Sequence, residues 1–303
     1  MLRWRLLSAT LIITPLLVLI VADFHYHFGA PGIWLVPLAL WLTAAAVREV
    51  LYLFHGQNLH PSSWSVHAGA QIVVLAGFVP LLQNLSGLTL PEFIFSTYLN
   101  WPLLAVAFAS ALIFSAEMLR FRQPGQSVIH VALGIMTVIY LAVPIVFLTA
   151  LRLHHDNRWG MAALVSVIFV VKMSDAGAYF SGRYLGRRKL APRISPKKTV
   201  AGLIGGLATA AIASWIFFQL IVVGIVGSAT EPSSWMGSLV YGLLIGFAGV
   251  IGDLSESLLK RDMQCKDSGA SLPGLGGILD VLDSLLLAAP IAYFCWVVGL
   301  VGP

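Results

Sequence analysis

Residues 128–151 read VIHVALGIMTVIYLAVPIVFLTAL and contain no Asp, Glu, Lys or Arg. A helix needs about 20 apolar residues to cross a bilayer, and this stretch is long enough. The whole chain has the same character, because 58% of its 303 residues are hydrophobic and 10% are charged. Soluble domains have about 25% charged residues. The composition therefore excludes a soluble globular protein and predicts an all-α polytopic membrane protein.

Apolar segments of similar length recur along the chain and predict about nine transmembrane helices. Their approximate bounds are 6–23, 31–53, 64–84, 101–119, 128–151, 159–180, 200–226, 236–258 and 277–301. The two cysteines, Cys265 and Cys295, form neither a disulfide framework nor a zinc-binding pattern. We interpret both as small apolar residues.

The Lys and Arg residues predict the orientation, because basic residues near the ends of spans stay on the cytoplasmic side. With a cytoplasmic N-terminus, 15 of the 18 Lys and Arg residues lie on the inner side. Seven of them lie between Arg183 and Lys198, more than orientation requires. This basic loop is also expected to attract anionic head groups or phosphorylated ligands.

The distribution of charged residues changes near residue 172. Before it they lie mostly at span ends, and after it they crowd the connections 172–202 and 252–284. We therefore divide one integral membrane unit into N-terminal transmembrane helices, 1–171, and C-terminal helices that carry the chemistry, 172–303.

Acidic residues are concentrated beside the last two predicted spans. Six of the chain's 13 acids lie there: Asp253, Glu256, Asp262, Asp267, Asp280 and Asp283. An Asp at the centre of a membrane helix costs about 2.5–3.5 kcal/mol, so such groups face a wet cavity, a cation or a partner charge. Asp253 and Lys260 share one helical face, as do Asp280 and Asp283. Carboxylates from two helix ends that converge favour a hard cation such as Mg²⁺, whereas structural ion pairs are the alternative interpretation.

Two further segments indicate phosphate binding. Pro273-Gly274-Leu275-Gly276-Gly277 lets backbone N–H groups approach a ligand closely, although such a turn is equally a connector between spans. Ser195-Pro196-Lys197-Lys198-Thr199 is predicted to be a turn that opens a helix, which suits an anion at the helix N-terminus. The alternative is a solvated basic loop.

These segments resemble the phosphatidate cytidylyltransferase (CDP-diacylglycerol synthase) family. Its C-terminal signature runs Ser-x-x-Lys-Arg, four residues, Lys-Asp, then Pro-Gly-His-Gly-Gly and Asp-Arg-x-Asp. The matching positions here are Ser257, Lys260, Arg261, Lys266, Asp267, Pro273, Gly274, Gly276, Gly277, Asp280 and Asp283. The stretches from Asp175 to Arg183 and from Ser195 to Thr199 are similar to a second region of the family.

The resemblance implies transfer of a cytidylyl group from CTP to phosphatidate, which yields CDP-diacylglycerol and pyrophosphate. Asp253 and Asp280 are expected to bind the catalytic Mg²⁺, with Asp283 as a further ligand or beside it, and Lys260 is expected to hold a phosphate. The expected substrate-binding residues are Asp175, Ser195, Lys197, Lys198, Thr199, Arg261, Lys266, Asp267, Gly276 and Gly277. The site is expected to face the cytoplasm from a bacterial inner membrane. Membrane lipid is an expected partner and nucleic acid is not; the number of copies stays open, with a homodimer as one option.

Three positions depart from the family pattern. Leu275 replaces a His, Val281 replaces an Arg, and Ala201 stands where an acid usually follows the Ser-Pro-Lys-Lys-Thr segment. Leu275 cannot transfer a proton, and Val281 cannot make a bidentate phosphate contact. Other readings are therefore a non-catalytic relic, a paralogue that acts on another lipid phosphate, and a secondary transporter. The transporter predicts interrupted spans in both halves, whereas the charges here are confined to one half and one side.

Overall fold

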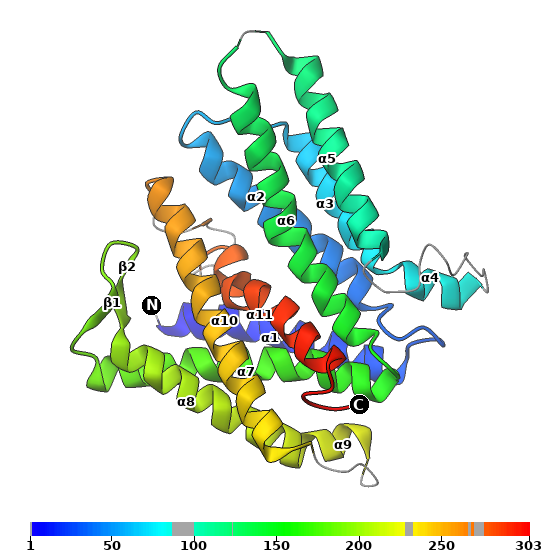
Figure 1. Cartoon of the computed structure of the whole chain (residues 1–303), viewed down its shortest axis with the longest axis vertical. Helices are drawn as coiled ribbons and strands as arrows, with labels where there is room; N and C mark the ends of the chain where they lie inside the picture. Colours follow the sequence, from blue (N-terminus) through cyan, green and yellow to red (C-terminus); the bar gives the residue numbers. More distant parts are fainter. Residues whose placement is uncertain (1, 87–99, 123, 228–232, 266–267, 270–275) are drawn as a thin grey trace. The chain divides into compact units, whose positions relative to one another are not determined.

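The computed structural model describes residues 2–86, 100–122, 124–227, 233–265, 268–269 and 276–303 (Figure 1). The described elements are helices except for one two-stranded hairpin. In chain order they are α1 (Leu2–His25), α2 (Leu35–His55), α3 (Ser63–Gly77), α4 (Val79–Ser86), α5 (Asn100–Arg120), α6 (Ser127–Arg152), α7 (Asn157–Leu185), β1 (Lys189–Ala191), β2 (Ser195–Thr199), α8 (Val200–Ile216), the π-helix η1 (Phe217–Ile221), α9 (Val222–Val226), α10 (Trp235–Asp262) and α11 (Leu279–Val297).

Within the described ranges, seven helices are long and apolar enough to cross a membrane. They are α2, α5, α6, α7, the continuous run from α8 to α9, α10 and α11. Each matches one of the predicted segments, so the prediction of an all-α polytopic membrane protein is confirmed. The count of nine spans is not confirmed by these seven helices.

The other two predicted segments, 6–23 and 64–84, coincide with shorter apolar helices or parts of helices. The stretch Thr14–His25 of α1 is apolar. Segment 64–84 forms two helices, because the chain leaves helical geometry at Phe78, where φ is −97° and ψ is 5°. Pro80 follows in the first turn of α4, where a missing backbone N–H is tolerated.

The described chain forms two compact units. The first comprises Met1–Ala150 with Met263–Val281, and the second comprises Leu151–Asp262 with Leu282–Pro303. The division predicted after residue 171 is of another kind, because it separates the helices expected to carry the chemistry from the rest. It stays a prediction.

In the first unit, α3 packs against α2 and α5. Small residues allow these helices to approach closely. A Cβ added to Gly69 of α3 would lie 3.0 Å from the Ala109 side chain of α5, and one added to Gly134 of α6 would lie 3.1 Å from Val66 and from Ile113. Close backbone approach at small residues is the usual way in which membrane helices pack.

In the second unit, α8 packs against α7 and α10. Aromatic side chains fill its interior, where Trp296 of α11 contacts Phe218 of η1 and Trp159 of α7. The buried Tyr241 hydroxyl of α10 lies 2.8 Å from the Ser166 hydroxyl of α7. These contacts fix the helices that carry the acidic residues described below.

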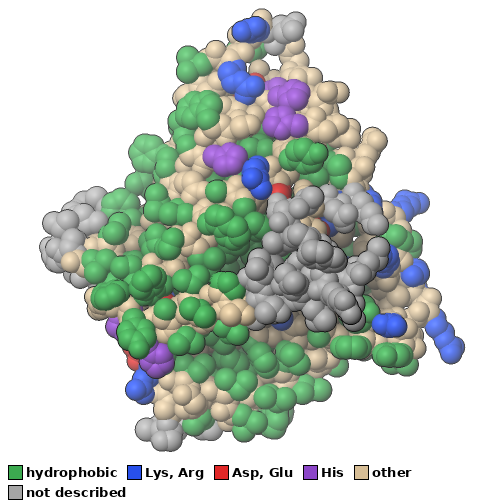
Figure 2. Space-filling model, turned by 180° about the vertical axis from the view of Figure 1, so that it is seen from behind, with side chains coloured by type: hydrophobic (Ala, Val, Ile, Leu, Met, Phe, Trp, Pro, Cys, Tyr) green, Lys and Arg blue, Asp and Glu red, His purple; other side chains and the backbone are tan. Residues whose placement is uncertain are grey.

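Large hydrophobic side chains are exposed on both units, and Figure 2 shows them spread over one face of the molecule. Leu103 and Phe108 of α5 are 68% and 63% exposed, and Leu220 of η1 is 65% exposed. Exposed apolar side chains on long apolar helices are suited to lipid. The chain is therefore an integral membrane protein.

Candidate functional site

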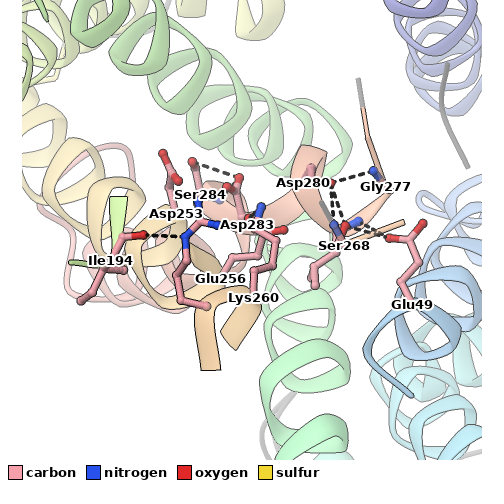
Figure 3. A network of polar contacts seen from close by, with 12 residues as sticks. Glu49, Ile194, Asp253, Glu256, Lys260, Ser268, Gly277, Asp280, Asp283 and Ser284 are labelled. Atoms are coloured by element: carbon pink, nitrogen blue, oxygen red, sulfur yellow. Dashed lines mark hydrogen bonds and ion pairs between the residues drawn. The ribbon is translucent and has the colours of Figure 1, made fainter. Parts of the chain in front are cut away.

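Three carboxylates of the second unit lie close together. Asp253 and Glu256 are one turn apart on α10, and Asp283 lies on α11 (Figure 3). One oxygen of each lies within 4.8 Å of the others. Glu256 is 1% exposed and Asp283 is 8% exposed. Buried carboxylates this close repel one another unless positive charge compensates them.

A glycine allows the two acidic helices to approach. A Cβ added to Gly252 of α10 would lie 3.1 Å from the Asp283 carbonyl carbon and 3.1 Å from the Ser284 Cα. Both are backbone atoms of α11, so any larger side chain would push the helices apart. Gly252 directly precedes Asp253, and its small size thereby brings the α10 carboxylates to Asp283.

Two lysines compensate the α10 carboxylates. Lys198 Nζ lies 2.7 Å from Asp253 Oδ2, and Lys260 Nζ lies 2.7 Å from Glu256 Oε2. These lysine side chains are only 19% and 12% exposed, respectively. Lys260 lies on the same helical face as Asp253, but it pairs with Glu256, one turn back on its own helix.

The hairpin that follows α7 carries Lys198 to the carboxylates. Ser195–Thr199 forms strand β2, paired antiparallel with β1, where sequence analysis predicted a turn. Pro196 favours extended backbone, and a two-stranded ribbon tolerates its missing N–H. The predicted helix does begin next, at Val200, where the Thr199 side chain accepts a hydrogen bond of 3.1 Å from Gly202 N.

Other predicted substrate-binding residues lie on or beside this hairpin. Ser195 is half-buried and Lys197 is exposed, both on β2. Arg261, at the end of α10, donates from Nε to the Ile194 carbonyl oxygen over 3.3 Å. This bond connects the C-terminal end of α10 to the hairpin.

Asp175 of α7 is linked to the carboxylates through a serine. The Ser284 hydroxyl lies 3.2 Å from Asp283 Oδ1 and 3.4 Å from Asp175 Oδ1. Lys172 Nζ lies 3.3 Å from Asp175 Oδ2. The second unit thus gathers Asp175 with the three carboxylates, and lysines contact three of these four acids.

Asp280 makes its described contacts within the first unit. Its Oδ2 accepts hydrogen bonds from Ser268 Oγ at 2.7 Å and from Gly277 N at 2.7 Å. Gly276 has a φ of +98°, a conformation that favours glycine. These contacts hold Asp280 at the start of α11, one turn before Asp283; its predicted role as a metal ligand stays a prediction.

Glu49 of α2 holds the same helix start. Its Oε1 accepts from Ile278 N at 3.0 Å and its Oε2 accepts from Leu279 N at 2.9 Å. The side chain is buried, and Ser268 Oγ lies 3.4 Å from Oε2 (Figure 3). A carboxylate at a helix N-terminus satisfies N–H groups that have no partner within the helix.

Sequence reasoning passed over Glu49 and did not assign a role to Glu256. Glu256 had a usable signal, since it lies three residues after Asp253 and four before Lys260 on one helix. Five residues of the predicted motifs lie outside the described residues: Lys266, Asp267, Pro273, Gly274 and Leu275. The roles predicted for Lys266 and Asp267 therefore stay predictions.

The three carboxylates fit a hard divalent cation. They offer only oxygen ligands, two of them are buried, and they lie within 4.8 Å of one another. Mg²⁺ is bound by one or two carboxylates together with water and substrate phosphates. Lysines beside such a cation can neutralise phosphate oxygens. The arrangement is therefore suited to binding a polyphosphate next to a metal ion.

Comparison with known proteins agrees with this chemistry. Residues 4–298 match the cytidylyltransferase family. A phosphatidate cytidylyltransferase of Haemophilus influenzae is 42% identical over 141 residues, which cover 46% of this chain and 48% of that protein. A phosphatidate cytidylyltransferase of Bacillus subtilis is 38% identical over 161 residues, covering 53% of this chain and 57% of that protein. The Escherichia coli protein YnbB, named as uncharacterized, is 41% identical over 145 residues, or 48% of this chain and 46% of that protein. The chain thus spans about half the length of the curated relatives that it matches.

Proposed function

Since this chain belongs to the cytidylyltransferase family, we propose that it transfers a cytidylyl group from CTP to phosphatidate. The products are CDP-diacylglycerol and pyrophosphate. Relatives that bear the name phosphatidate cytidylyltransferase support this substrate pair. The exposed apolar helices support a lipid substrate, which enters from the membrane while CTP enters from water.

One observation carries the proposal. Asp253, Glu256 and Asp283 lie within 4.8 Å of one another, and Lys198 and Lys260 each contact one of these carboxylates at 2.7 Å. Carboxylates bind the cation that accompanies a nucleoside triphosphate, and lysines bind its phosphates. This combination is what nucleotidyl transfer requires.

The reaction needs no activated side-chain nucleophile. An anionic phosphate oxygen of phosphatidate attacks the α-phosphorus of CTP, and the bond from that phosphorus to pyrophosphate breaks. The main barrier is the approach of two polyanions, which positive charge lowers. Lys198 and Lys260 supply this charge by exchanging their carboxylate partners for phosphate oxygens. Ser195 and Thr199, at the two ends of β2, position a phosphate by hydrogen bonds.

We propose that Asp253, Glu256 and Asp283 hold a divalent cation, Mg²⁺, with Asp280 one turn away on α11. When bound, this cation neutralises phosphate charge and aligns the two reacting groups. The carboxylates that bind it lie on two helices, so the packing of α10 against α11 determines whether the site exists.

We place this site on the cytoplasmic side of a bacterial inner membrane. The basic residues of the hairpin support this orientation, because Lys and Arg near span ends stay in the cytoplasm. CTP is supplied from the same side. The proposal involves no nucleic acid.

The test measures pyrophosphate release by purified protein with CTP, phosphatidate and Mg²⁺. The parent protein is expected to release pyrophosphate, and a chelator is expected to stop the release. Asp283→Asn should lower the rate about 100-fold or more, since it removes one cation ligand worth several kcal/mol. The matched control is Asp262→Asn, because Asp262 is an exposed acid at the end of α10. Unchanged turnover in Asp283→Asn would overturn the site assignment.

A panel of lipid phosphates tests the substrate. Phosphatidate is expected to give the fastest release. Release with another lipid phosphate alone would identify a paralogue, in keeping with the replacements at Leu275 and Val281. No release with any lipid of the panel would contradict an enzymatic role.

A further inference from the structure

A polar cavity of about 340 Å³ lies in the first unit, at the ends of α5 and α6 that the connection 121–126 joins. The residues that line this cavity take no part in the proposed reaction. Six of the residues that line it are polar or charged: Glu117, Arg120, Arg122, Gln126, Ser127 and His130. This volume suits a small polar group.

Glu117 is the buried group in this cavity. Its side chain is 9% exposed, and its Oε1 lies 3.0 Å from His130 Nδ1. The Nε2 of His130 accepts a hydrogen bond of 3.3 Å from His60 N, so Nδ1 carries the proton and donates to Glu117. Both ring nitrogens of His130 and one oxygen of Glu117 are therefore occupied.

The second carboxylate oxygen of Glu117, Oε2, differs from Oε1 in its hydrogen bonding. Among the residues that the structure describes, no donor lies within hydrogen-bond distance of Oε2, although this atom is buried. Arg120 Nη1 lies 3.9 Å from it. Buried carboxylate oxygens are normally hydrogen-bonded, and leaving one without a donor is costly. Glu117 is also among the residues that line the cavity, so a ligand bound there is the available source of a donor for this oxygen.

Two arginines that line the cavity favour an anion, whereas the Glu117 carboxylate favours a hydrogen-bond donor. Arg120 and Arg122 are both exposed, and their guanidinium groups suit a phosphate. α6 begins at Ser127, so its first backbone N–H groups add a positive end beside them. The cavity thus combines one carboxylate oxygen inside with positive charge at its mouth.

The surroundings of the cavity are apolar and exposed. Leu119 of α5 is 86% exposed, Val128 of α6 is 83% exposed and Phe121 between them is 56% exposed. Both helices are long enough to span a membrane, so their joined ends lie at its surface. Figure 2 shows Lys or Arg and His side chains among hydrophobic ones at the upper end, where Figure 1 places the connection from α5 to α6.

We propose that this cavity binds the head group of a phospholipid that carries a primary ammonium, such as phosphatidylethanolamine. The ammonium donates to Glu117 Oε2, the phosphate contacts Arg120 and Arg122, and the acyl chains lie along Phe121 and Val128. A hydroxyl in the head group can also donate to Glu117 Oε2, but without the positive charge that strengthens the bond to a carboxylate. A choline head group has no N–H to donate, so it does not satisfy this oxygen.

The experiment measures lipid adducts on the purified full chain by native mass spectrometry. The probes are phosphatidylethanolamine, phosphatidylcholine and phosphatidylglycerol with the same acyl chains. We expect phosphatidylethanolamine to bind about tenfold more tightly than phosphatidylcholine, as the loss of one hydrogen bond to a charged group predicts. Phosphatidylglycerol should bind with an intermediate affinity, because its hydroxyls can donate but carry no charge. Soluble phosphoethanolamine at the same concentration should leave the adduct in place, because it lacks acyl chains.

Two variants assign the adduct to the cavity. Glu117→Gln, whose amide oxygen can still accept from His130, should remove the preference for phosphatidylethanolamine over phosphatidylcholine. Arg122→Gln, at an exposed position, should weaken binding of every phospholipid. Arg158→Gln, an exposed arginine of the second unit, is the matched control and should bind as the parent does.

Equal binding of phosphatidylethanolamine and phosphatidylcholine would overturn the proposal. So would an unchanged preference in Glu117→Gln, or displacement of the adduct by soluble phosphoethanolamine at equal concentration. None of these comparisons uses pyrophosphate release. The proposal for the lipid site and the proposal for the reaction can therefore be overturned separately.

Discussion

Asp253 and Glu256 of α10 and Glu49 of α2 each have a specific partner. Asp253 contacts Lys198, Glu256 contacts Lys260, and Glu49 accepts two backbone N–H groups. Charged groups inside membrane proteins are costly unless they are paired or hydrated. The partners therefore explain how an apolar chain accommodates these acids, of which Glu49 and Glu256 are buried.

Glu49→Gln tests how the start of α11 is held. The amide keeps one acceptor oxygen but loses the negative charge that stabilises a helix N-terminus. We expect the free energy of unfolding to fall by about 1.5–3 kcal/mol, the range for a hydrogen bond to a charged group. Unfolding in detergent, followed by tryptophan fluorescence, measures it.

Asp262→Asn serves as the control for Glu49→Gln, because Asp262 is an exposed acid. It should unfold with the parent's free energy. If Glu49→Gln is equally stable, the carboxylate does not hold the helix start.

Some site residues could be predicted from sequence and others could not. Asp253, Lys260, Asp283 and Lys198 stood out because charged residues are rare in this chain. Glu49 did not, because its backbone partners Ile278 and Leu279 lie 229 and 230 residues away in sequence. A single carboxylate inside an apolar span gives no indication of so distant a partner.

At the level of elements, apolar length predicted the long helices well. The segment predicted at 200–226 coincides with α8, η1 and α9. The break at Phe78 and the hairpin β1–β2 were not predicted. The hairpin lacks the alternation of apolar and polar residues that indicates a strand, because β2 is a basic segment with a proline.

Gly252→Ala tests whether helix packing forms the carboxylate site. The added methyl group meets backbone atoms of α11, so we expect a loss of about 1–3 kcal/mol in stability through overpacking. The separation of α10 from α11 should also lower pyrophosphate release, although no charged group is changed. Thermal unfolding and the release assay measure the two effects.

Gly249→Ala is the matched control, since it lies one turn earlier on α10. A Cβ at Gly249 would lie 3.7 Å from the Ser284 Cβ, which is ordinary contact. This variant should keep both stability and turnover. Equal behaviour of the two variants would show that the close approach at Gly252 does not matter for the site.

For the molecule as a whole, composition predicted the class of protein but not the two compact units. Residues 263–281 belong with the N-terminal helices rather than with their sequence neighbours. Hydropathy carries no information on which helices pack together, because lipid-facing and packed helices are similarly apolar.

Cysteine labelling in cells tests the orientation. In a Cys265→Ser, Cys295→Ala background, Arg187→Cys should react with a membrane-impermeant maleimide only after the membrane is permeabilised. Trp235→Cys, at the other end of the second unit's helices in the predicted topology, should react in intact spheroplasts. The reverse pattern would contradict a cytoplasmic site.

Binding of Mn²⁺, followed by electron paramagnetic resonance, tests the central claim most directly. Mn²⁺ shares the oxygen-ligand preference of Mg²⁺, and the purified full chain is expected to bind it. Asp283→Asn and Glu256→Gln should each weaken binding about tenfold or more, whereas Asp262→Asn should bind as the parent does. Undiminished binding in both Asp283→Asn and Glu256→Gln would contradict a cation site formed by α10 and α11.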